Sequence, residues 1–367
     1  MRGLSLSWPF SSDNAGRSTD LLHSSMKSAH FLICLVLFCS INCSAFAGLA
    51  AAQTPANQDD DVIRVESDLT NLLFIATDRQ NHFMTTLRQE DLRVLEDGVP
   101  QQLFTFQRET DRPLSLAFLI DVSGSEERTL SQEKGAARSF IETILRSKHD
   151  EAAIIPFTDR AFVEQALTSN VIGIYQALER VDVAMPTYLG SGPPISGIAD
   201  RPGMAVAREG STAIWDAVTL TAGRILGPGS GKRRRAIILL TDGYDTSSRI
   251  ARATAINQAI ETETVIYAIG IGDSRQLGVN RDPLRVVADG TGGRAFFPKN
   301  EADLKAAFNQ IEQELRSQYL IAYMSSNKKR DGSYRRMQIE IVNPALARDQ
   351  LKLRHRPGYY AKGSANQ

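Results

Sequence analysis

The stretch that decides the fold is Leu114-Ser-Leu-Ala-Phe-Leu-Ile120, which runs directly into Asp121-Val-Ser-Gly-Ser125. Its near-continuous apolar character predicts a strand buried on both faces, as in a parallel sheet that helices cover on either side. Later runs share this character, at residues 152–155, 236–240 and 265–269. We therefore expect these runs to be strands of one mostly parallel sheet.

The segments between these runs have helical periodicity. Two of them repeat apolar residues on one helical face, namely Phe140, Ile141, Ile144 and Leu145 in one, and Leu304, Phe308, Ile311 and Leu315 in the other. Strands that alternate with helices predict a doubly wound α/β domain. We place this domain at residues 112–316.

Two β-rich segments flank the α/β domain, at residues 62–111 and 317–362. In the first, Asp97-Gly98 lies between residues 92–96 and residues 102–106, a pattern that predicts a β-hairpin. This segment has about 50 residues and is too small to be very stable alone. We expect the two segments to pack together as one sandwich-like unit beside the α/β domain.

The N-terminal part of the chain has the pattern of an exported protein. Lys27 and His30 precede an apolar run at residues 31–39, and small residues follow as far as residue 52. This is typical of a secretory signal peptide, and the run is shorter than the ~20 residues of a membrane span. We interpret residues 1–52 as a signal peptide with an upstream segment, with Met26 as an alternative start and an uncleaved anchor as the alternative reading.

Several expectations follow from this export signal. Residues 53–61 are polar and predict a linker. Cys34, Cys39 and Cys43 all lie in the signal segment, so the mature chain has no cysteine and no disulfide. We expect a secreted, periplasmic or cell-envelope protein without a membrane span after cleavage.

The overall charge excludes one class of partner. Lys+Arg and Asp+Glu both number 42, so the net charge is zero. Such a chain has no global electrostatic attraction for nucleic acid or for an anionic membrane. We therefore expect no nucleic-acid partner.

Three loops carry residues that suit a hard cation. Asp121, Ser123 and Ser125 follow the first buried strand, Thr212 precedes an amphipathic helix, and Asp242 follows the strand at residues 236–240. Ligands of open α/β sheets bind at the carboxyl ends of the strands, and Mg²⁺ prefers oxygen ligands in near-octahedral geometry. These five residues are our predicted metal ligands.

Each loop also has a structural interpretation. Ser123 and Ser125 could cap a helix that begins near Glu126, and Thr212 could be an N-cap. Asp242 and the glycine after it could be an ordinary turn at a strand end. Asp216 and Asp245, which lie close by in sequence, are interpreted as residues beside the site or on the surface.

The ordered set resembles the metal-ion-dependent adhesion site of von Willebrand factor type A domains. That pattern is Asp-x-Ser-x-Ser with a distant Thr and a distant Asp, and the predicted ligands fill all of its positions over ~200 residues of matching strand and helix order. The flanking segments, with Thr77-Asp78, Leu95-Glu-Asp-Gly98 and Pro357-Gly-Tyr-Tyr360, further resemble secreted bacterial VWFA-related proteins. The resemblance implies Mg²⁺, with Mn²⁺ or Ca²⁺ as alternatives, and a protein partner that presents Asp or Glu.

The leading functional hypothesis is therefore a cation-dependent protein-binding or adhesion module outside the cytoplasm, not an enzyme. The alternatives are a metal-dependent hydrolase and a structural envelope protein with a vestigial site. Catalytic zinc sites normally contain histidines, and none of the five histidines lies in the three loops. The Gly/Pro-rich segment at residues 183–211 is either an insertion or a loop that shapes the ligand surface.

Overall fold

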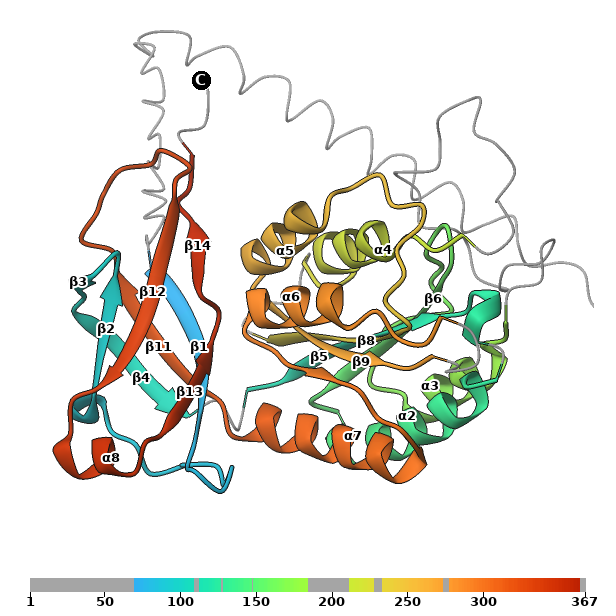
Figure 1. The fold of residues 1–367 in the computed structure, drawn as a ribbon, viewed down its shortest axis with the longest axis horizontal. Coiled ribbons are helices and arrows are strands. Elements are labelled where there is room, and N and C mark those ends of the chain that lie inside the picture. Colours follow the sequence, from blue (N-terminus) through green and yellow to red (C-terminus); the bar gives the residue numbers. More distant parts are fainter. Residues whose placement is uncertain are drawn as a thin grey trace, which may run out of the picture. The chain divides into compact units, whose positions relative to one another are not determined.

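The computed structural model describes residues 69–108, 112–126, 128–146, 148–183, 211–227, 233–272 and 277–363 (Figure 1). The predicted signal peptide, the linker and nearly all of the Gly/Pro-rich segment lie outside these residues. Within the described ranges, no helix combines the length and the apolar character needed to cross a bilayer.

The two β-rich segments form one sandwich. Residues from both segments occur in each of its sheets, because β1 pairs with β11 and β2 pairs with β12, both antiparallel. The first sheet has the order β13 (Lys352–His355), β1 (Leu69–Thr77), β11 (Tyr319–Met324) and β4 (Leu103–Arg108). The second has the order β14 (Gly358–Tyr360), β12 (Tyr334–Ile341), β2 (Leu92–Glu96) and β3 (Val99–Pro100).

The core of the sandwich confirms that the segments pack together. Its buried side chains come from both sheets and include Leu72 and Phe74 of β1, Val94 of β2 and Met337 of β12. Short elements complete the unit, namely the 3₁₀ turn η1 (Gln89–Asp91) and α8 (Pro344–Arg348). The boundaries of the two β-rich segments, at residues 62–111 and 317–362, remain a prediction.

The predicted hairpin is right at its turn and wrong in its second strand. Asp97 and Gly98 both have positive φ, and β2 pairs with β3 directly across them. Residues 103–108, however, form β4 and pair with β11 in the opposite sheet. Phe106 of β4 stacks on Tyr319 there, with 5.3 Å between ring centroids, so long-range aromatic packing overrides the local hairpin pattern.

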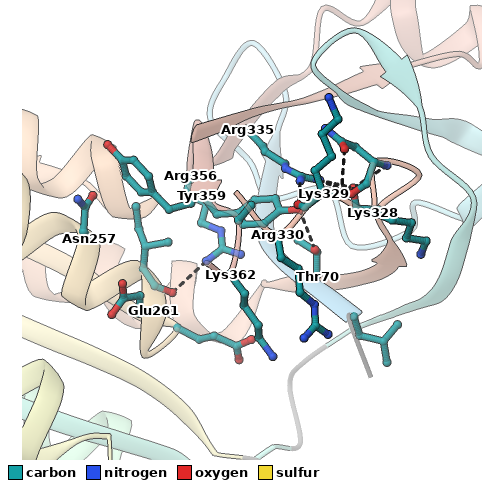
Figure 2. A pocket seen from close by; sticks show the side chains of 17 residues that line it. Thr70, Asn257, Glu261, Lys328, Lys329, Arg330, Arg335, Arg356, Tyr359 and Lys362 are labelled. Atoms are coloured by element: carbon teal, nitrogen blue, oxygen red, sulfur yellow. Dashed lines mark hydrogen bonds between the residues drawn. The ribbon is translucent and has the colours of Figure 1, made fainter. Parts of the chain in front are cut away.

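A hollow of about 340 Å³ lies beside β14 and α5 (Arg252–Glu261), and Figure 2 shows its lining. Its cationic residues are Lys328, Lys329, Arg330, Arg335, Arg356 and Lys362. Arg335, which is buried, and Arg356, which is half-buried, serve the fold. Arg335 forms an ion pair with Glu96 at 3.1 Å, and Arg356 donates to the carbonyl of Asn71 at 2.6 Å.

The remaining strands form the expected mixed sheet, mostly parallel. Its order is β10-β9-β8-β5-β6-β7, in which β7 alone among the described strands of this sheet runs antiparallel to its neighbour. The strands are β5 (Leu114–Asp121), β6 (Glu151–Phe157), β7 (Gln165–Thr168), β8 (Arg234–Thr241), β9 (Thr264–Gly270) and β10 (Ala295–Phe296). All four apolar runs identified in the sequence are strands of this sheet.

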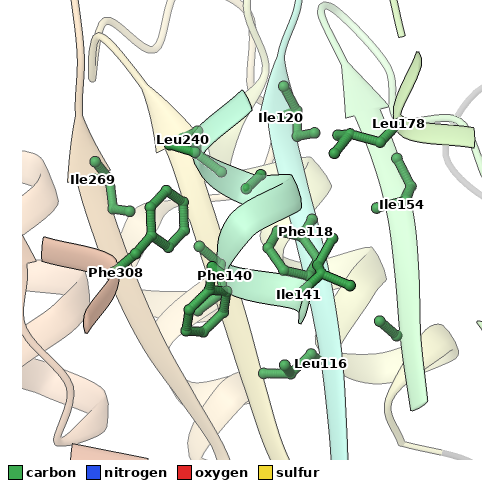
Figure 3. Close-up of a cluster of buried hydrophobic side chains, with 14 of the residues drawn as sticks. Leu116, Phe118, Ile120, Phe140, Ile141, Ile154, Leu178, Leu240, Ile269 and Phe308 are labelled. Atoms are coloured by element: carbon green, nitrogen blue, oxygen red, sulfur yellow. The ribbon is translucent and has the colours of Figure 1, made fainter. Parts of the chain in front are cut away.

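Helices cover both faces of this sheet, so the doubly wound α/β fold is confirmed. One face packs against α2 (Leu130–Ile144), α3 (Val171–Arg180) and α7 (Glu301–Arg316), as the cluster around Phe118, Phe140 and Phe308 shows in Figure 3. The other face packs against α4 (Ile214–Leu220), the π-helical turn η3 (Thr221–Ile225), α5 and α6 (Arg281–Thr291). Alternate residues of β5 enter the two cores, which is why its sequence is apolar throughout.

Candidate metal site

The predicted loops meet where the order of the sheet reverses. From β5 the chain crosses through α2 to β6 on one side, whereas β8 pairs with β5 on the other side. Loops that leave neighbouring strands in opposite directions leave a crevice at the carboxyl edge, and ligands of open α/β sheets bind there. The Asp121 loop and the Asp242 loop flank this crevice.

Asp121 is the last residue of β5 and is completely buried. Its Oδ2 accepts a hydrogen bond from Thr241 Oγ1 at 2.6 Å, and its Oδ1 accepts one from the Ser123 amide at 3.0 Å. Burial raises the pKa of Asp121 from 3.8 to about 6, although these hydrogen bonds act in the opposite direction. Such a carboxylate is oriented by its neighbours but is not neutralised by them.

Ser123 and Ser125 lie together on this loop. Their hydroxyl oxygens are 3.0 Å apart, and the short 3₁₀ turn η2 (Gly124–Glu126) holds them there. The capping alternative does not apply to α2, because its N-cap is Thr129 and no side chain caps it. Two adjacent hydroxyls with no capping role fit the oxygen ligands of a hard cation.

Asp242 follows β8 and is also buried, with 7% of its surface exposed. Its Oδ1 accepts a hydrogen bond from the Tyr244 amide at 3.0 Å. Gly243 has φ +84°, and a Cβ there would lie 2.4 Å from the Asn280 carbonyl oxygen. Only glycine fits this turn, which sets the position of Asp242.

Thr212 is buried and is held against the loop that follows β8. Its amide donates to Thr246 Oγ1 at 2.8 Å, and its carbonyl accepts from the amides of Thr246 and Ser247. Thr212 is not the N-cap of α4, because Ala213 has that position. At the start of α4, the backbone amide of Ile214 donates a hydrogen bond to Asp245 Oδ1 at 2.8 Å.

Asp245 and Asp216 therefore act beside the site, as interpreted from the sequence. Asp216 Oδ1 accepts hydrogen bonds from the amides of Arg249 and Ile250, at 3.0 and 2.8 Å. Together the two carboxylates tie the loop after β8 to the start of α4. This connection brings Thr212 and Asp242 to the same edge of the sheet.

The sequence analysis missed Glu126. Carboxylate oxygens of Asp121, Glu126 and Asp242 lie within 4.8 Å of one another, and all three residues are buried. The only signal in the sequence is an acidic residue directly after Ser125, which looks like the first turn of a helix. Its burial, at 0% exposed, depends on tertiary packing.

A second buried acid lies behind this group. Glu133 of α2 is 1% exposed, and neither of its carboxylate oxygens has a hydrogen-bond partner within the described residues. Burial raises the pKa of both Glu126 and Glu133, and the charges of Asp121 and Asp242 raise them further. A buried donor set with this excess of negative charge fits a divalent cation.

The hollow in Figure 2 is the weaker candidate for a functional site. Arg335 and Arg356 of its lining already bind Glu96 and backbone carbonyls, whereas the sheet edge gathers three buried carboxylates within 4.8 Å of one another. Like charges that are buried together are costly and indicate a missing partner. The edge near Asp121 is therefore the stronger candidate for a functional site.

Comparison with known proteins matches part of this domain to a family. Residues 202–310 match the von Willebrand factor type A domain family. The matched segment contains Thr212 and Asp242, whereas the Asp121 loop precedes it. No curated protein matches the chain in sequence.

Solved structures with a similar fold come from several organisms. Proximal thread matrix protein 1 from the mussel byssus, in a form with a zinc-occupied MIDAS motif, is 17% identical over 59% of this chain and 48% of its own, with a TM-score of 0.45. The chain thus spans about half the length of the mussel protein. A von Willebrand factor type A protein from Catenulispora acidiphila is 15% identical over 82% of this chain and 74% of its own, with a TM-score of 0.45. BatB from Bacteroides thetaiotaomicron is 20% identical over 56% of this chain and 97% of its own, with a TM-score of 0.41.

Proposed function

The chain carries a von Willebrand factor type A domain, and we propose that it is a divalent-cation-dependent protein-binding module that works outside the cytoplasm. The observation that carries the proposal is the convergence of buried acidic oxygens from the two loops at the reversal point of the sheet. Asp121, Ser123, Ser125, Thr212 and Asp242 are the proposed ligands, and Mg²⁺ is the proposed ion.

The proposed mechanism follows from the chemistry of these ligands. The bound ion supplies an electrophilic position that attracts an anionic group. Ser123, Ser125 and Thr212 are neutral, so they leave much of the charge of the ion available. With these residues holding the ion, a carboxylate from an Asp or Glu of a partner protein would bind to it.

The alternative of a metal-dependent hydrolase gains no support from the site. The loops that carry the proposed ligands contain no histidine, and the hydroxyl of Thr241 that donates to Asp121 is fully buried. A hydroxyl without access to substrate does not serve as a nucleophile. We therefore propose a binding role without catalysis.

The test begins with metal binding. Asp121→Ala should abolish Mg²⁺ binding by calorimetry, while the sheet survives because the residue ends its strand. Asp282→Ala is the matched control, because the side chain of Asp282 is 90% exposed on α6. Wild-type affinity in Asp121→Ala would show that the site is assigned wrongly.

The second step tests adhesion on an immobilised peptide array. Peptides with a central Asp or Glu should bind in Mg²⁺, and their Asn or Gln counterparts should not. Asp121→Ala and EDTA should each remove binding, and together should do no more than either alone. A variant that loses Mg²⁺ but still binds the acidic peptides would refute the bridging mechanism.

The proposed location has its own test. The apolar run at residues 31–39 and the small residues after it support export. N-terminal sequencing of the mature protein should then begin near Gly48 or Gln53. Recovery of only a full-length cytoplasmic form would contradict export.

A further inference from the structure

Glu126 has an oxygen that nothing else in the described fold uses. Its Oε2 accepts a hydrogen bond from Thr129 Oγ1 at 2.7 Å, which holds the side chain in one orientation. Its Oε1 is buried and has no hydrogen-bond partner among the described residues. The carboxylate nevertheless lies within 4.8 Å of the oxygens of Asp121 and Asp242.

The surroundings of Glu126 make the orphaned oxygen more costly. Glu133 lies next to it, and the charges of Asp121 and Asp242 also act on both glutamates. Four buried acids thus face one another without a cation among the groups that act most strongly on them. A buried acid in such a group either takes up a proton or gains a cation beside it.

We propose that Glu126 is a direct ligand of the divalent cation through Oε1. This inference rests on the proposed metal site and adds a third carboxylate to Asp121 and Asp242. The hydrogen bond from Thr129 holds the Glu126 carboxylate close to the other two acids and leaves Oε1 available for the ion. Glu133 lies behind it and adds to the negative field without taking a coordination position.

A third carboxylate changes what the site binds. The three carboxylates carry more negative charge than a divalent ion neutralises, which raises affinity for the ion but weakens the attraction of the bound ion for the carboxylate of a partner. Mg²⁺ is usually held by one or two carboxylates, whereas Ca²⁺ sites gain affinity with the number of charged ligands. Glu126 should therefore favour Ca²⁺ and Mn²⁺ relative to a site with two carboxylates.

The experiment is a calorimetric titration of Mg²⁺, Mn²⁺ and Ca²⁺ into the full chain and its variants. Glu126→Gln keeps the shape of the side chain and should weaken binding roughly tenfold or more, with the largest loss for Ca²⁺. Glu126→Asp keeps the charge and should recover part of the affinity. Glu314→Gln is the matched control, because Glu314 is equally buried but forms an ion pair with Arg294 at 2.8 Å.

A second readout does not depend on affinity. In the Mn²⁺ complex, electron–nuclear double resonance should detect more bound water in Glu126→Ala than in the wild type, because Ala leaves a coordination position open. In EDTA, Glu126→Gln should melt near the wild-type temperature, because the two side chains have the same shape. Added metal should raise the melting temperature of Glu126→Gln less than it raises that of the wild type.

The outcomes separate this inference from the metal site on which it rests. Loss of binding in Asp121→Ala, with wild-type affinity in Glu126→Gln and the wild-type water count in Glu126→Ala, would overturn the role of Glu126 and leave the metal site intact. Wild-type binding in Asp121→Ala would overturn both. Weaker binding in Glu126→Gln and added water in Glu126→Ala, with no change in Glu314→Gln, would establish Glu126 as a ligand.

Discussion

Replacing Asp121 with Asn in the metal-free protein should stabilise the fold at neutral pH. A pKa of about 6 in place of 3.8 means that ionising Asp121 costs the folded state about 3 kcal/mol. Asn removes this cost but disturbs the 2.6 Å hydrogen bond from Thr241, which is worth about 1 kcal/mol. The expected net gain in the free energy of unfolding is about 2 kcal/mol at pH 7.5.

The pH dependence gives the sign of this effect. Because the folded pKa is raised, the metal-free fold is favoured while Asp121 is protonated and loses stability as the pH rises from about 4 to above 6. The gain from Asn should therefore be largely lost near pH 4. Burial lowers the pKa of His355, which gives the opposite slope near neutral pH, but this contribution is common to both proteins and cancels in the difference.

The assay is urea unfolding in EDTA at pH 4 and pH 7.5, repeated at pH 7.5 with Mg²⁺. At a hundred times its Kd, Mg²⁺ should stabilise the wild type by about 2.7 kcal/mol, and Asp121→Asn hardly at all. In Mg²⁺ the wild type should then be more stable than Asp121→Asn, the reverse of their order in EDTA. An Asn variant that is less stable than the wild type in EDTA, by the same amount at both pH values, would refute the reasoning.

Other substitutions test separate parts of the structure. Ser123→Ala should weaken Mg²⁺ binding in calorimetry by about tenfold or less, because water replaces a neutral hydroxyl; complete loss of binding would contradict this role. Gly243→Ala should lower both the melting temperature and the Mg²⁺ affinity, because its Cβ would meet backbone at 2.4 Å. Gly98→Ala has similar φ but open space, so it should cost only about 1 kcal/mol and leave Mg²⁺ binding unchanged. Glu96→Ala leaves Arg335 buried and unpaired, and urea unfolding should show a loss of about 3–5 kcal/mol without a change in metal affinity.

The α/β domain could be predicted because its signals are local. Residues 114–120 are apolar throughout, since alternate side chains enter cores on the two faces of the sheet, and this double burial is visible in the sequence itself. The position of Asp121 at the carboxyl end of its strand follows from the same run. Because the carboxyl ends of parallel strands share one edge, the sequence also predicted that Asp242 would lie near Asp121.

The partner of a β-strand is not a local property. Residues 92–96 and 102–106 have the alternation and the turn of a hairpin, yet only the turn is correct. Phe106 instead stacks on Tyr319, more than 200 positions later in the chain, and its strand pairs with β11. Such a choice depends on which surfaces the folded sheets bring together.

Burial of charge likewise depends on tertiary structure. The sequence identified residues whose chemistry suits a cation, and their order along the chain was enough to predict the edge at which they meet. Glu126 has the same chemistry, but its side chain reaches Asp121 and Asp242 because η2 turns it inward and α2 closes over it. Whether an acid lies in water or beneath a helix is decided by packing between segments distant in sequence, and this decides which acids can share one ion.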